Sequence, residues 1–353
     1  MTPSPSASTT PDGGPPPPRP SSSVVLLSPV NQVLLLHRVK TSSSFASAHV
    51  FPGGNLDEFH DGDIPGVDSP ERHRDGLAYR IGAIRETFEE TGILLARKKD
   101  GSGELVNLED VDREAARRRV HANEVRFTDW VDSVGGIPDT DNLIPFTRWI
   151  TPTNVPKRFT TQMYLYLLPL ATGPSCIPSR MLVPTPDGGV EHTAATFAPA
   201  QAFLSRAAAK DIILFPPQYF LLWILTKFVS GTISEGAGPL HHASQRERLL
   251  AYIRRVPAAE TARGREHWTS RISWADKVMS PHNLLIRQSD QRAVLGLDKP
   301  GPELKGSGRG GDWERVALVR FTKRGPMEVQ IRRREDVLAE EREASEKKEG
   351  AKL

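Results

Sequence analysis

The chain has 353 residues, of which 46 are Lys or Arg and 43 are Asp or Glu, and its formal net charge at pH 7 is +3. A single cysteine, Cys176, excludes an intramolecular disulfide and a cysteine-based zinc site. No uninterrupted apolar run reaches the roughly 20 residues of a membrane span, and no dense basic stripe with interleaved aromatic residues indicates a nucleic-acid partner.

The N-terminal part of the chain contains a polar leader and several short strands. Residues 1–22 are rich in Ser, Thr and Pro, which predicts a disordered leader. The apolar runs 24–27 and 32–38 predict a hairpin, and residues 49–54 predict a strand that ends at a Gly-Gly corner. Residues 57–75 are polar and predict a long loop.

A helix is predicted from Leu77 to Leu94. Its apolar residues, including Leu77, Ile81 and Phe88, recur at helical spacing and are expected on one side. Gly92 lies where a C-terminal glycine cap is common.

The second half of the ordered region also mixes helices and strands. Residues 104–132 are expected to be helical, and residues 143–150 and 162–168 are expected to form strands. Residues 196–209 predict a strand end followed by a short helix, and residues 218–229 predict a buried helix.

We therefore divide the chain into four segments. An α/β domain is expected at residues 23–230, followed by an extension of unclear role at 231–334 and a charged tail or helix at 335–353. The extension contains a possible hairpin across Gly325-Pro326. Its excess of basic residues is interpreted as solvated surface, although these residues are also candidates for contacting a phosphate.

The segment that carries chemistry lies on the helix predicted from Leu77. Glu89 and Glu90 lie three and four positions after Glu86, so the three carboxylates are expected on one side of that helix. Three like charges repel one another unless cations neutralise them. Arg85 supplies one cation, and oxygen-only ligands suit Mg²⁺ or Mn²⁺.

These residues resemble a known motif. Phe51-Pro52-Gly53-Gly54, followed by Arg85-Glu86-x-x-Glu89-Glu90-x-Gly92-Ile93, is similar to the Nudix box, Gly-x5-Glu-x7-Arg-Glu-U-x-Glu-Glu-x-Gly-U, where U is aliphatic. A Nudix box that is interrupted by an insertion between Gly54 and Arg85 resembles the peroxisomal and mitochondrial coenzyme A diphosphatase branch. Further similar stretches include Trp149–Pro152, Pro156–Thr161 and Pro216–Gln218.

The resemblance implies a Nudix-type α/β/α sandwich with a mixed β-sheet, a disordered N-terminal leader and a C-terminal extension. It also implies metal-dependent hydrolysis of coenzyme A and acyl-coenzyme A to 3′,5′-ADP and (acyl-)4′-phosphopantetheine. Arg85, Glu86, Glu89 and Glu90 are the implied catalytic residues. The three glutamates and the Gly54 carbonyl are the implied ligands of Mg²⁺ or Mn²⁺.

The substrate contacts are less fully specified. Gly53 and Gly54 are expected to let a ligand approach bare backbone, and Arg158 is either a phosphate contact or a surface residue. Glu191 is a candidate general base, although an exposed loop residue is the simpler interpretation.

The sequence departs from the family pattern at two places. The spacing from Gly54 to Arg85 is 17 residues longer than in the family, and Leu77 stands where the first glutamate of the box is expected. Two alternatives therefore remain open. One is a Nudix hydrolase for ADP-ribose, NADH or capped nucleotides, and the other is a non-catalytic Nudix-like binding module.

The sequence ends in Ala351-Lys352-Leu353, which is similar to the Ser-Lys-Leu peroxisomal signal. We expect a peroxisomal location through the import receptor for this tripeptide, with the mitochondrion or cytoplasm as alternatives.

Overall fold

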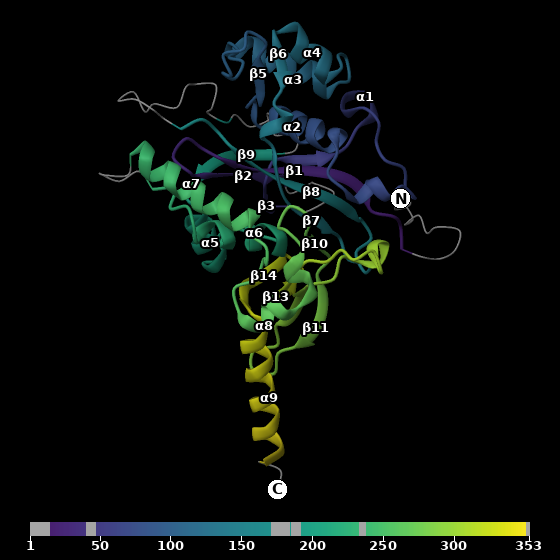
Figure 1. Ribbon diagram of the computed structural model, residues 1–353, viewed down its shortest axis with the longest axis vertical. Helices are drawn as coiled ribbons and strands as arrows, with labels where there is room; N and C mark the ends of the chain where they lie inside the picture. Colours follow the sequence, from purple (N-terminus) through teal and green to yellow (C-terminus); the bar gives the residue numbers. More distant parts are fainter. Residues whose placement is uncertain (1–14, 40–46, 171–183, 185–191, 233–237, 351–353) are drawn as a thin grey trace, which may run out of the picture.

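The computed structural model describes residues 15–39, 47–170, 184, 192–232 and 238–350. Their main feature is a mixed sheet with helices on both faces, as predicted for an α/β/α sandwich (Figure 1). The helices are α1 (Glu58–Asp61), α2 (Leu77–Thr91), α3 (Asp110–His121), α4 (Phe127–Ser133), α5 (Ala200–Ala208), α6 (Pro216–Thr226), α7 (Pro239–Arg254), α8 (Ala262–Glu266) and α9 (Arg334–Gly350).

The main sheet has eight strands in the described part of the chain, in the order β10-β7-β8-β1-β2-β3, with β4 paired to β1 and β9 paired to β2. The β1–β8 and β7–β10 pairs are parallel and the other pairs are antiparallel. The strands of this sheet are β1 (Arg19–Leu27), β2 (Val33–Arg38), β3 (His49–Val50), β4 (Gly53–Asn55), β7 (Ile144–Ile150), β8 (Phe159–Leu167), β9 (His192–Ala198) and β10 (Val278–Met279).

Alternation along β1 explains why both faces of the sheet are covered. Successive side chains of a strand point to opposite faces, and here both sets are apolar. Val24 and Leu26 pack in the core that contains α2, α3 and α4, whereas Val25 and Leu27 pack in the core that contains α5, α6 and α7. The sheet therefore separates the helix predicted to carry the chemistry from α6.

The predicted elements are present, but the start of order is earlier than expected. β1 begins at Arg19, inside the segment predicted to be a disordered leader. Ser21, Ser22 and Ser23 are buried because β1 pairs with β8 on one side and with β4 on the other. The Ser21 hydroxyl forms a hydrogen bond with the Thr161 hydroxyl, so this buried polar group has a partner inside the sheet.

The long loop predicted at residues 57–75 contains local structure. α1 begins after Asp57, whose side chain accepts a hydrogen bond from the Phe59 N–H as an N-cap. A 3-10 turn follows at Pro70–His73. A second small two-stranded sheet, β5 (Ala96–Lys98) with β6 (Gly136–Pro138), lies with α3 and α4 above α2 (Figure 1).

The chain after residue 230 joins the main sheet and also builds a sheet of its own. β10 pairs with β7 at the edge of the main sheet, so the expected boundary at residue 230 does not separate two independent sheets. The second sheet contains β11 (His282–Ile286), β12 (Ala293–Leu297), β13 (Asp312–Thr322) and β14 (Gly325–Arg333). α9 starts against this sheet and then extends away from the body (Figure 1). None of the described helices is long and apolar enough to cross a membrane.

Candidate active site

The three glutamates of the predicted site lie on α2, which packs closely against the sheet. Ile81, Ile84 and Phe88 are buried, and the left-handed Gly92 ends the helix by donating its N–H to the Phe88 carbonyl. The predicted helix and its glycine cap are confirmed, but the helix ends at Thr91 and not at Leu94, because the left-handed Gly92 terminates it. The placement of Leu77 on the buried side was wrong, because its side chain is 67% exposed at the first position of the helix.

Arg85 is a buried cation that holds carboxylates from two helices. Its Nε and Nη2 donate to the two oxygens of Asp61, each at 2.9 Å. Its Nη1 donates to Glu89 Oε1 at 2.8 Å and lies 3.0 Å from Glu86 Oε1. Burial alone would lower the pKa of Arg85, but Glu86, Asp61 and Glu89 together raise it well above its ordinary value. One guanidinium therefore fixes two of the three predicted glutamates.

The glycine corner lies directly against the other side of the cluster. The Gly53 N–H donates to Glu90 Oε2 at 2.8 Å. A Cβ atom on Gly54 would lie 2.6 Å from the Glu86 carboxylate, and Gly53 has a φ of +151°. Glycine is therefore required for this close approach, and the structure brings Gly53 and Gly54 together with Glu86 and Glu90.

Asp61 is the residue that sequence reasoning missed. Its side chain has no exposed area, and it also accepts a hydrogen bond from the Asp57 N–H at 2.9 Å. The carboxylate partner of Arg85 thus lies within the inserted segment, residues 57–75, whereas Leu77 follows it. A usable signal was the Asp57 N-cap, which starts a helical turn that carries Asp61 toward α2.

A second missed contact comes from α3, which reaches the end of the box helix. Arg117 donates two hydrogen bonds to the Glu89 carbonyl, at 3.0 and 2.7 Å. This carbonyl belongs to the last turn of α2, where carbonyl groups lack partners within the helix. His121 Nδ1 lies 3.2 Å from Glu89 Oε2, and Glu114 holds Arg117 through both carboxylate oxygens. The sequence showed only a charged helical stretch here.

Arg158 has a different environment from the four box residues. It is buried and forms an ion pair with Glu303 of the extension at 2.5 Å. It also donates to the carbonyls of Thr151 and Pro16. Its predicted phosphate contact stays untested, and Glu191 lies outside the described residues.

The segment that contains α2 is similar to a known family. The model of the NUDT19 Nudix domain matches residues 67–224. Asp61 and the glycine corner lie before the matched residues.

Two relatives with assigned names are similar to the chain. A putative nudix hydrolase 7 of Caenorhabditis elegans is 34% identical over 137 residues, which are 39% of this chain and 40% of that protein. An acyl-coenzyme A diphosphatase NUDT19 of Gallus gallus is 28% identical over 277 residues, covering 65% of this chain and 69% of the relative. The predicted resemblance to Nudix hydrolases of the coenzyme A diphosphatase branch is confirmed.

A solved Nudix hydrolase from Alicyclobacillus acidocaldarius is also similar. Its alignment covers 61% of this chain and 98% of that chain, with 22% sequence identity and a TM-score of 0.46.

Nudix hydrolases generally use divalent metal ions, and the donor set here suits such ions. Glu86, Glu89 and Glu90 supply hard oxygen ligands beside bare glycine backbone. Within the described ranges no group of three or more His, Cys, Asp or Glu side chains is already arranged to hold an ion. The carboxylates instead contact Arg85 and the Gly53 N–H, so binding a cation requires them to share or exchange these contacts.

Proposed function

We propose that the chain hydrolyses the pyrophosphate bond of coenzyme A and acyl-coenzyme A, giving 3′,5′-ADP and (acyl-)4′-phosphopantetheine. One observation carries this proposal. Three glutamates converge with Arg85 beside the Gly53–Gly54 corner, in a chain that matches an acyl-coenzyme A diphosphatase over 277 residues.

The residues of the chain have distinct roles in this proposal. Arg85 fixes Glu86 and Glu89, and the absence of a side chain at Gly54 lets the Glu86 carboxylate lie directly against the glycine corner. Mg²⁺ or Mn²⁺ held by the three glutamates and the Gly54 carbonyl would polarise the phosphates and lower the pKa of the attacking water. Water adds to one phosphorus, the bridging P–O bond breaks, and the bridging oxygen leaves on the other phosphate.

Residues 231–350 add contacts that support a role in shaping this site. Glu303 holds Arg158 at the start of β8, and Arg309 donates a hydrogen bond to the His73 carbonyl of the inserted segment. Both contacts join the extension to elements that flank β1. We propose that the extension fixes the insertion beside the substrate entrance.

The experiment is a product analysis by phosphorus NMR. Purified protein with Mg²⁺ or Mn²⁺ is incubated separately with coenzyme A, ADP-ribose, NADH and a capped dinucleotide, beside Glu89→Gln and the exposed control Glu124→Gln. We expect 3′,5′-ADP to form fastest from coenzyme A, with the control retaining activity and Glu89→Gln losing about 10²-fold or more.

Faster cleavage of another substrate would assign a different Nudix reaction. No cleavage by the unmutated protein, together with calorimetric binding of coenzyme A, would assign the non-catalytic binding module. The peroxisomal location and its receptor depend on residues 351–353, which lie outside the described residues, and these two expectations remain predictions.

A further inference from the structure

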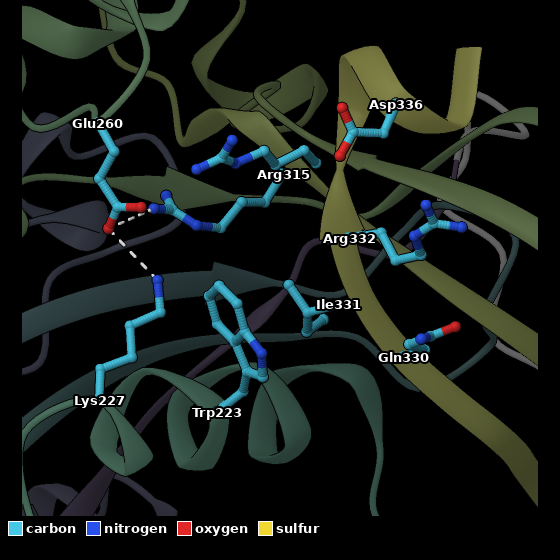
Figure 2. A pocket seen from close by; sticks show the side chains of 9 residues that line it. Trp223, Lys227, Glu260, Arg315, Gln330, Ile331, Arg332 and Asp336 are labelled. Carbon is cyan, nitrogen blue, oxygen red and sulfur yellow. Dashed lines mark hydrogen bonds and ion pairs between the residues drawn. The ribbon is translucent and has the colours of Figure 1, made fainter. Parts of the chain in front are cut away.

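A cavity of about 370 Å³ lies on the face of the main sheet opposite α2. It is a half-open pocket lined by the end of α6, by β13 and β14, and by the start of α9, so it lies where the extension meets the predicted Nudix domain (Figure 2). Its volume falls within the range of small-molecule sites, which often form between structural units.

At one wall of the cavity, three cations contact the same carboxylate oxygen. Glu260 Oε1 lies 2.9 Å from Arg315 Nη2, 3.3 Å from Lys227 Nζ and 3.7 Å from Arg255 Nη2. Arg315 is 2% exposed, and its Nη1 also pairs with Asp312 at 2.9 Å and with Glu314 at 3.3 Å. The charge of Arg315 is therefore compensated by carboxylates of the chain itself.

The opposite wall adds positive charge from β14. Arg332 is paired with both oxygens of Glu340, whereas the exposed Arg333 side chain has no partner among the described residues. Asp336 is the acidic group on this side. The cavity therefore offers Arg333 as a cation available to a ligand.

An aromatic and aliphatic floor lies between the two walls. Lys227 Nζ lies 3.9 Å from the centre of the Trp223 ring, and Ile331 stands beside that ring (Figure 2). Burial, and then the neighbouring Arg315, lower the pKa of Lys227 below its ordinary value. Lys227 thus lies half-buried beside a second cation and the Trp223 ring, with Glu260 as its carboxylate partner at 3.3 Å.

We propose that this cavity binds a small organic phosphate, with its oxyanion held by Lys227 and Arg333 and its body against Trp223 and Ile331. A phosphate offers several acceptor oxygens and more than one negative charge, which suits two cations that approach from the end of α6 and from β14. The site is separate from the glutamate cluster on α2 and does not depend on the proposed hydrolysis.

The test uses the full chain without divalent metal, so that the glutamate site is not engaged. AMP is titrated by calorimetry, with inorganic phosphate and adenosine as the two partial probes. Lys227→Gln/Arg333→Gln is compared with Lys347→Gln/Lys348→Gln, which removes the same charge from the exposed end of α9. We expect AMP to bind more tightly than either partial probe, and the cavity double variant to weaken its binding at least tenfold.

Hydrogen exchange locates the binding. AMP should protect residues 222–228 and 330–336 in the unmutated protein and in the α9 control, but not in the cavity variant. Arg333→Gln alone has no ion pair to lose, so it gives a folded test if the double variant is unstable. Equal AMP affinity in all variants, or no AMP binding by the unmutated protein, would overturn the proposal. Equal affinity for phosphate and AMP would overturn the role of Trp223.

Discussion

Two charge clusters on opposite faces of the main sheet are centred on side chains of opposite charge. On the α2 face, one buried guanidinium, that of Arg85, contacts Asp61, Glu86 and Glu89. Negative charge is in excess there, and a bound cation would reduce the repulsion among the carboxylates.

The cluster beside α6 reverses this arrangement. One carboxylate, that of Glu260, contacts Lys227, Arg255 and Arg315, but Asp312 and Glu314 also pair with Arg315. The comparison teaches that the sign of an expected ligand follows from charge that the chain does not balance. On the α2 face this is the excess of carboxylates over Arg85, and beside α6 it is the exposed Arg333, which has no partner among the described residues.

Removing Arg85 should give the largest effect. Arg85→Met leaves the fully buried Asp61 without its cation, so we expect a loss of about 3–5 kcal/mol in the free energy of unfolding. Urea unfolding measures this loss. Arg74→Met is the control, because its pair with Glu71 is exposed and 4.0 Å long, and should cost less than about 1 kcal/mol. Equal losses in the two variants would contradict the role of Arg85 as the centre of the cluster.

A smaller effect is expected when the support of Glu89 is removed from outside α2. Arg117→Met leaves the Glu89 carbonyl without its two donors and should destabilise the protein by about 1–3 kcal/mol. We also expect kcat for coenzyme A to fall about tenfold with KM little changed. Arg118→Met changes the next, exposed residue of α3 and is the matched control. If thermal unfolding and kcat are the same in both variants, α3 does not position Glu89.

The cluster around Glu260, beside α6, is tested with Glu260→Gln. This substitution removes the carboxylate that Lys227, Arg255 and Arg315 share. The side chain is 30% exposed, so the expected loss at pH 7 is about 1 kcal/mol, below that of the buried Arg85 cluster. Burial would raise the pKa of Glu260, but Arg315 and Lys227 outweigh it and lower the pKa below 4.5. The stabilisation is thus complete above pH 4.5 and is lost as the pH falls through the folded-state pKa.

Thermal unfolding of the unmutated protein and Glu260→Gln across this pH range measures the difference. The two stabilities should converge in acid. A gap that stays constant down to pH 3 would show that the ionised carboxylate is not the stabilising group.

The smallest effect is expected at Leu77, the position where the box pattern expects a glutamate. Leu77→Glu should change kcat less than twofold, because Asp61 already supplies the carboxylate that Arg85 binds. An acidic residue in the first turn of α2 should raise stability by about 0.3–1 kcal/mol. Initial rates measure the change in kcat, and calorimetric unfolding measures the change in stability. A large rise in activity would mean that Asp61 does not replace the missing glutamate.

The parts of the site that were predictable depend on local pattern. The apolar spacing from Ile81 to Phe88 and the position of Gly92 specify α2 without information from distant residues. The glutamates follow because helical geometry alone places them together. The glycine corner was identified as a close approach, and Glu86 proved to be the group that approaches it.

The parts that were not predictable depend on distant pairing. Nothing in the sequence shows which acidic residue of the 57–75 segment folds back to Arg85. Arg158 finds its carboxylate at Glu303, far along the chain. The serines of β1 looked like part of a polar leader because their burial results from pairing with β8 and β4.

The Asp61–Arg85 pair also has a consequence for how this motif is searched for. Closing a longer loop costs only about 0.6 kcal/mol per doubling of its length. The two halves of a box can therefore be separated by a longer stretch of sequence while Asp61 and Arg85 still form their ion pair. A search pattern with fixed spacing will miss such chains, and here even the family match begins only at residue 67. A pattern with a variable gap, and with either acidic residue allowed shortly after the Gly-Gly corner, would retrieve them.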